Sequence, residues 1–246
     1  MGKAKNRTSS EVKGNILKTD KTQLPSKTPT PTVSQTAGGG PSVSSYDIFL
    51  ACIGRANNIV KLHKAAHGKK AKPEKYLADA HRAAVVLAIS ALDAFVRSLV
   101  VSKVRQLLSD STKALPDSLC ALVKRLLKED GLFDAARQYD LLDRVEKALQ
   151  GDFEKKSFQG TKVITEYLEM VGHKNVFHSV AINAQLNEDK LRDQLDEFTK
   201  RRHIIAHNGD LDLTENPPKE KPITKTYATD CIKLVTTIAK TVNQMG

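Results

Sequence analysis

The sequence predicts an all-α protein, and three observations support this fold class. From Tyr46 onward, apolar residues recur at intervals of three and four, which is the period of an amphipathic helix. No segment alternates apolar and polar residues as a half-buried strand would. Glycine and proline are scarce for a turn-rich all-β domain, at 13 and 9 of 246 residues. Because 40% of the residues are hydrophobic, the chain can bury a core.

Residues 1–45 differ in composition from the rest, and we expect a disordered basic tail there. They hold seven Lys or Arg, two acids and four of the nine prolines. Such a segment buries too little apolar surface to offset the entropy lost on ordering. Its net charge of +5 suits either contact with a polyanion or a role in solubility. Residues 46–246 are then expected to form one all-α domain.

Two helices are expected in the first part of this domain. Ser44 or Ser45 is a suitable N-cap for a first helix that reaches about His67. The segment 68–73 combines glycine, lysine and proline and should break the chain. A long second helix should then run from about Tyr76 to Leu108.

Capping residues and glycines divide the remaining chain into five more helices. Asp117 and Asn187 are suitable N-caps, and a polar loop with Pro217 and Pro218 precedes the final helix. The expected ranges are 117–130, 134–149, 161–171, 187–208 and 227–245.

The chain is expected to be cytoplasmic. Its three cysteines lie far apart without a CxxC pair, so neither a disulfide framework nor a structural zinc site is indicated. The N-terminus lacks the apolar region of a secretory signal. The most apolar run, 83–101, carries Asp93 and Arg97 near its centre, which favours a buried helix over a membrane span.

Two charged residues occupy positions in apolar stripes. Arg202 interrupts the stripe of the helix that begins at Asn187, and Asp93 interrupts the stripe of the second helix. Because a lone buried charge is costly, the two are expected to pair where these helices pack together. The alternative is that Asp93 pairs with Arg97, four residues on, while Arg202 extends to solvent.

Two histidines follow Arg202 on one helical face. His203 and His207, four residues apart, have a spacing that can chelate zinc, but no Glu follows His203 and no third ligand is evident. We therefore expect neither a metal nor another cofactor. Imidazole beside guanidinium also suits phosphoryl transfer, since His moves a proton and Arg neutralises phosphorane charge. Because Asn208 and Gly209 end the helix, His207 is expected near solvent.

The run Leu195-Asp-Glu-Phe-Thr-Lys-Arg-Arg202-His203-Ile-Ile-Ala-His207-Asn-Gly resembles the Arg-polar-x3-His signature of the HEPN superfamily, and most closely that of its RiboL-PSP subgroup. The segment from Ser90 to Phe95 is similar to the Ser-x-Leu-acid-x-Phe helix of that subgroup. The chain departs from the pattern at His203, where Asn is commoner, and in the residue that separates His207 from the glycine.

The resemblance implies a HEPN-like helical bundle with additional helices, and a metal-independent endoribonuclease or an RNA-binding relative without catalysis. Arg202 and His207 would be the catalytic pair, His203 the accompanying polar position and Asp93 the acidic position of the earlier helix. HEPN active sites form across a two-fold dimer and often belong to toxin or defence systems. The resemblance thus implies a homodimer and an antitoxin or defence-system partner. A helical protein-interaction module is the remaining alternative.

Basic residues provide candidate contacts to RNA. Six lysines and one acid lie in the segment 61–75, a density that can hold a phosphate backbone, although a solvated surface has the same composition. Two polar residues of the signature lie beside the proposed catalytic pair. The candidate RNA-contacting residues are Lys69, Lys70, Lys72, Arg201 and Asn208.

Overall fold

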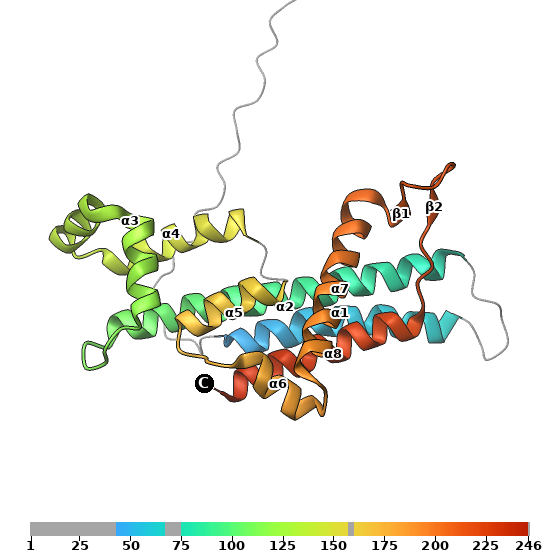
Figure 1. Ribbon diagram of the computed structural model, residues 1–246, viewed down its shortest axis with the longest axis horizontal. Helices are drawn as coiled ribbons and strands as arrows, with labels where there is room; N and C mark the ends of the chain where they lie inside the picture. Colours follow the sequence, from blue (N-terminus) through green and yellow to red (C-terminus); the bar gives the residue numbers. More distant parts are fainter. Residues whose placement is uncertain (1–42, 67–74, 157–159, 246) are drawn as a thin grey trace, which may run out of the picture. The chain divides into compact units, whose positions relative to one another are not determined.

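The computed structural model describes residues 43–66, 75–156 and 160–245 and confirms the all-α fold class. Apart from one short hairpin, the regular structure in these ranges is helical (Figure 1). The predicted tail lies outside the described residues except for 43–45. The elements are α1 Ser45–Ala66, α2 Lys75–Ser109, α3 Asp117–Gln138, α4 Leu141–Lys155, α5 Thr161–Met170, α6 Val176–Ala184, α7 Glu188–Asn208, β1 Leu211–Asp212, β2 Lys219–Glu220 and α8 Lys225–Gln244.

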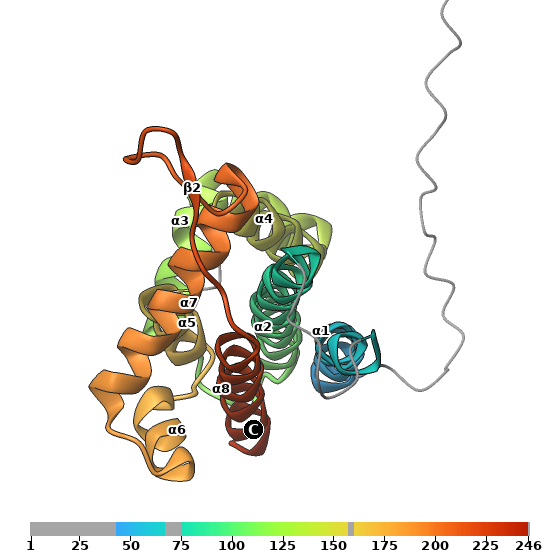
Figure 2. The same cartoon turned by 90° about the vertical axis from the view of Figure 1, so that its right-hand side faces the viewer.

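Helix α2 is the centre of the domain, with α1 on one side and α7 on the other (Figure 2). By length and composition it is the helix of the described part that could cross a membrane, over Leu77–Ser109. Its most apolar window is 56% buried against the other helices, as in the core helix of a soluble bundle. The apolar run around Asp93 therefore packs inside the domain, as the sequence predicts.

Local interactions fix the start of α1 against α2. The Ser44 hydroxyl accepts a hydrogen bond from the backbone N–H of Asp47 at 3.1 Å and donates one to the Asp47 carboxylate at 2.7 Å. Tyr46, Phe49 and Phe95 then form an aromatic cluster, in which Phe49 and Phe95 meet edge to face with ring centroids 5.8 Å apart. The first predicted cap and helix are confirmed.

Two boundaries in the middle of the chain differ from the expectation. Helix α3 continues to Gln138 across a kink at Lys128, so the predicted start of a fourth helix at residue 134 is wrong. Helix α6, which is nine residues long, was not predicted from the sequence. Its apolar residues pack into the core, but the helix is too short to show a clear period in the sequence.

A small β-hairpin replaces the loop expected after α7. Leu211 pairs with Glu220 and Asp212 with Lys219 in antiparallel register. The chain enters this hairpin through Gly209 and Asp210, which have φ angles of 60° and 64°. Glycine adopts this left-handed region freely, and aspartate tolerates it better than most residues. Helix α7 therefore ends abruptly, and the hairpin begins beside its last turn.

Candidate active site at the end of helix α7

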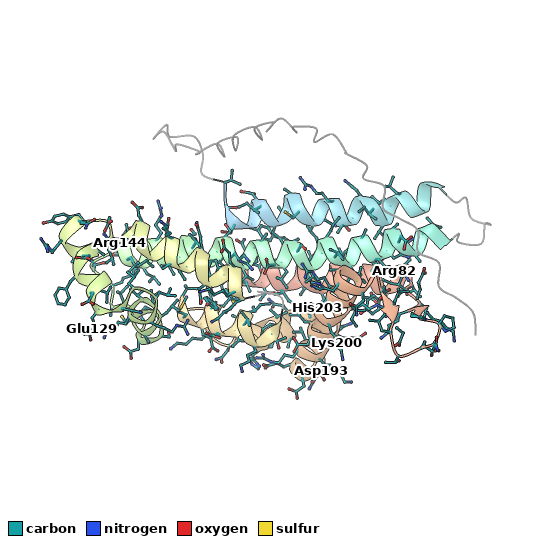
Figure 3. All side chains as sticks on the ribbon, turned by 90° about the horizontal axis from the view of Figure 1, so that it is seen from above. Arg82, Glu129, Arg144, Asp193, Lys200 and His203 are labelled. Atoms are coloured by element: carbon teal, nitrogen blue, oxygen red, sulfur yellow. The ribbon has the colours of Figure 1, made fainter. Side chains whose placement is uncertain are left out.

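Helix α7 has one face buried and one face open to solvent. Asn187 caps its start by accepting a hydrogen bond from the backbone N–H of Lys190 at 3.1 Å. Leu191, Leu195 and Phe198 are buried, as the predicted apolar stripe requires. This anchoring presents the opposite face, which carries Asp193, Lys200 and His203 in succession (Figure 3).

His203 and His207 lie side by side on the exposed face of the last two turns. Their ring centroids are 4.3 Å apart, the ring planes are tilted by 43°, and both residues are exposed. The predicted shared face and the solvent position of His207 are confirmed. An imidazole here can exchange protons with a bound substrate near neutral pH.

Arg202 is partly buried and has no partner among the described residues. Its Nε atom is enclosed without a hydrogen bond, and no ion pair to its guanidinium forms in the described ranges. Five residues separate it from His207, which places the two about 140° apart around the helix axis. Arg202 and His207 of one chain therefore face different directions.

The expected pair between Asp93 and Arg202 does not form. Asp93 instead pairs with Arg97 at 2.8 Å, although α2 and α7 do pack together as expected. Arg97 also donates hydrogen bonds to the backbone carbonyls of Phe153 at 2.8 Å and Lys156 at 2.9 Å. These contacts tie the end of α4 to α2, so the acidic position of the earlier helix orients an arginine rather than contacting the α7 motif.

Arg201, a candidate RNA contact, binds Asp210 within the domain. Its Nη2 donates a hydrogen bond to Oδ2 of Asp210 at 2.7 Å, and its Nε forms an ion pair with Oδ1 at 2.7 Å whose direction does not suit a hydrogen bond. Arg82 donates to the same Oδ2 at 2.7 Å. Both arginines also bind the carbonyl of Lys221 at 3.0 Å. Arg201 is therefore engaged inside the domain, and its contact with RNA stays a prediction.

The cluster of Arg82, Asp210 and Arg201 is deeply enclosed. Asp210 is fully buried and Arg82 is only 6% exposed. Burial alone lowers the pKa of Arg82, but hydrogen bonds to Asp210 and Asp79 outweigh it, so the pKa is raised. This cluster, which joins α2, α7 and the hairpin, was not predicted from the sequence. One signal was available, because Arg82 interrupts the apolar stripe of α2 three residues before Val85.

The other candidate RNA contacts are Asn208 and three lysines of the segment 67–74. Asn208 is exposed at the last position of α7. Lys69, Lys70 and Lys72 fall outside the described residues, so their contact with RNA stays a prediction. The ends of α1 and α2 that flank them lie at the same end of the domain as the hairpin (Figure 1).

The described residues do not assemble a metal site with three or more protein ligands. No group of three or more His, Cys, Asp or Glu side chains in the described ranges is placed to hold a metal ion. Cys231 is buried, and burial raises the pKa of its thiol to about 12, which leaves it inert as a nucleophile. Among the described groups at the end of α7, His203 and His207 can transfer a proton and Arg202 can supply a positive charge.

Comparison with known proteins gives one result. The family described as RiboL-PSP-HEPN matches residues 51–244, which include α2 and the whole of α7. No curated protein and no solved structure matches the chain significantly. The match covers most of the sequence, and both helices that carry the expected motifs lie within it. The chain therefore belongs to the RiboL-PSP-HEPN family.

Proposed function

We propose that the protein is a metal-independent endoribonuclease whose reaction depends on His207 and Arg202. Family membership supports a nuclease or other RNA-related role in general. The observation that carries the specific proposal is the end of α7, where the exposed pair His203 and His207 directly follows Arg202, an arginine without a described partner. A proton-transfer group and a cation are the two groups that phosphodiester cleavage needs.

The proposed reaction uses the 2′-hydroxyl of the RNA as its nucleophile. His207 takes the proton of that hydroxyl while water protonates the departing 5′-oxygen, or it protonates that oxygen while water takes the hydroxyl proton. Arg202 stabilises the charge on the phosphorane. The 2′-oxygen bond to phosphorus forms as the bond to the 5′-oxygen breaks, so the products are a cyclic phosphate and a 5′-hydroxyl. His203, beside His207, would donate a hydrogen bond to a phosphate oxygen.

Asp93 has a positioning role in this proposal. Asp93 pairs with Arg97 within α2, and Arg97 in turn donates a hydrogen bond to the carbonyl of Phe153 in α4. Asn208 and the lysines Lys69, Lys70 and Lys72 would hold the RNA backbone. A cytoplasmic location and a toxin or defence role with a regulating partner belong to the same proposal.

We expect the active protein to be a homodimer. Arg202 and His207 diverge by about 140° on one helix and cannot easily grip the same phosphate. A two-fold axis beside α7 would bring Arg202 of one chain to His207 of the other. Light scattering at the concentration of the activity assay should give the mass of two chains. A monomeric mass with full activity would contradict this arrangement.

A substrate substitution tests the reaction directly. Purified protein should cut mixed RNA in excess EDTA, and it should leave intact an RNA with a 2′-O-methyl group at the cut site. The reason is that the methyl group removes the proposed nucleophile while the phosphate and base remain. Gel analysis of both substrates in parallel gives the answer. Cleavage of the methylated RNA at an undiminished rate would refute internal attack.

A further inference from the structure

We propose that His203 and His207 also form a two-ligand binding site for a divalent transition metal, and that the bound metal blocks RNA cleavage. The binding site stands on the geometry of the two side chains alone. Its effect on cleavage rests on the proposed function. The metal is an inhibitor in this scheme and takes no part in the reaction.

The distance between the two rings suits chelation. Zinc binds imidazole nitrogen at about 2.0–2.1 Å in a tetrahedral arrangement, so two nitrogens on one ion lie roughly 3.3 Å apart. Rings with centroids 4.3 Å apart and planes tilted by 43° reach this separation by small side-chain rotations. The backbone of α7 need not move, because residues four apart on a helix already lie one above the other.

The surroundings leave both imidazoles available. Neither His203 nor His207 forms a hydrogen bond or ion pair with another residue in the described ranges, so binding a metal breaks no described polar contact. The site lies in the last turns of a 21-residue helix, where the helix dipole favours a cation. Lys200 and Arg202, on the same helix, oppose this attraction and limit the affinity.

The ligand set determines which metals fit. Two neutral imidazoles with water in the remaining positions suit copper, nickel and zinc, with copper bound most tightly, whereas magnesium prefers oxygen ligands. No third described side chain completes the site. Binding is thus expected to be reversible and removable by a chelator. While the metal is bound, the coordinated nitrogen of His207 cannot accept a proton from the substrate.

Nickel titration by isothermal calorimetry tests the site without an activity assay. His63 and His67 have the same spacing in the sequence, so the experiment uses His63→Ala as its background. In that background, His203→Ala should weaken nickel binding by about tenfold or more, because one imidazole remains. Magnesium should give no heat at either variant. Nickel binding that is unchanged by His203→Ala would overturn the proposed site.

His178→Ala is the matched control in the same background. His178 is an exposed histidine on α6 that faces Glu188 at 3.4 Å, and its removal should leave the α7 nickel site unchanged. A loss of binding in this control equal to that of His203→Ala would also count against the site.

The inhibitory effect has a separate readout. Nickel at saturating concentration should stop cleavage of RNA by the His63→Ala protein, and EDTA should restore it. Cleavage that continues while calorimetry shows the α7 site filled would refute inhibition. Nickel binding that depends on His203, in a protein that cuts no RNA under any condition, would refute the proposed function and leave the binding site in place.

Discussion

Asp210→Ala is expected to lower the free energy of unfolding by about 3–5 kcal/mol, because it leaves two enclosed arginines without their shared counter-charge. Asp210 is fully buried and accepts hydrogen bonds from Arg82 and Arg201, each at 2.7 Å. Neither guanidinium can reach full hydration without opening the contact between α2, α7 and the hairpin. Urea denaturation followed by circular dichroism measures the loss.

Two further variants separate the effect of the lost charge on stability from the effect of the unusual backbone conformation. Asp210 has a φ of 64°, which alanine tolerates poorly but asparagine adopts more easily. If the lost charge dominates, Asp210→Asn should retain most of the destabilisation. Asp212→Ala, in the same hairpin, removes a partly exposed carboxylate and should destabilise the domain far less than Asp210→Ala does. Equal stability of Asp210→Ala and Asp212→Ala would show that the buried cluster does not stabilise the domain.

His207→Ala is expected to reduce kcat for RNA cleavage by about 10²–10⁴-fold, the usual contribution of a positioned acid or base. The residue is exposed at the end of α7 and packs into no core, so the urea midpoint should not change. Cleavage of a labelled RNA in excess EDTA measures the rate, and filter binding measures RNA affinity. His178→Ala provides the control for removal of an exposed histidine.

Arg202→Lys extends this test to the second group of the proposed pair. Lysine keeps the positive charge but loses the planar guanidinium that can hold two phosphate oxygens, so kcat should fall while RNA binding changes little. RNA binding that survives both substitutions, in a protein without measurable cleavage, would favour the non-catalytic RNA-binding alternative. Full cleavage by His207→Ala would refute its proposed role.

The sequence alone predicted the structure correctly where the relevant interactions are local. The stripe of α7, its Asn187 cap and the shared face of His203 and His207 follow from helix periodicity and capping chemistry. The sequence left two partners open for Asp93, Arg202 on another helix and Arg97 on the same helix. The structure shows Arg97, which also donates hydrogen bonds to carbonyl groups at the end of α4. Packing decides whether a charged residue pairs with a local or a distant partner, and the sequence pattern does not show how the helices pack.

The burial of Asp210 and the existence of α6 could not be predicted because both depend on residues distant in the sequence. Asp210 stands in a polar segment after Gly209, and nothing in its neighbours indicates that it is fully buried. Its burial depends on Arg82, which is 128 residues away in the sequence. Helix α6 was not predicted because its burial depends on α7 and α8. With nine residues, it is also too short to show the helical period of apolar residues.

The Arg82–Asp210–Arg201 cluster also fixes the rotational phase of α7. Asn187 determines where the helix begins, and Asp210 holds the chain directly after the helix ends. The number of residues between these two points is therefore part of the site. One residue inserted between Phe198 and His203 would turn everything after it by about 100° relative to the buried stripe. Either His207 would leave its exposed face, or Asp210 would be pulled away from Arg82. Substitutions on the open face of α7 carry no such penalty, so the helix tolerates changes of side chain far better than changes of length.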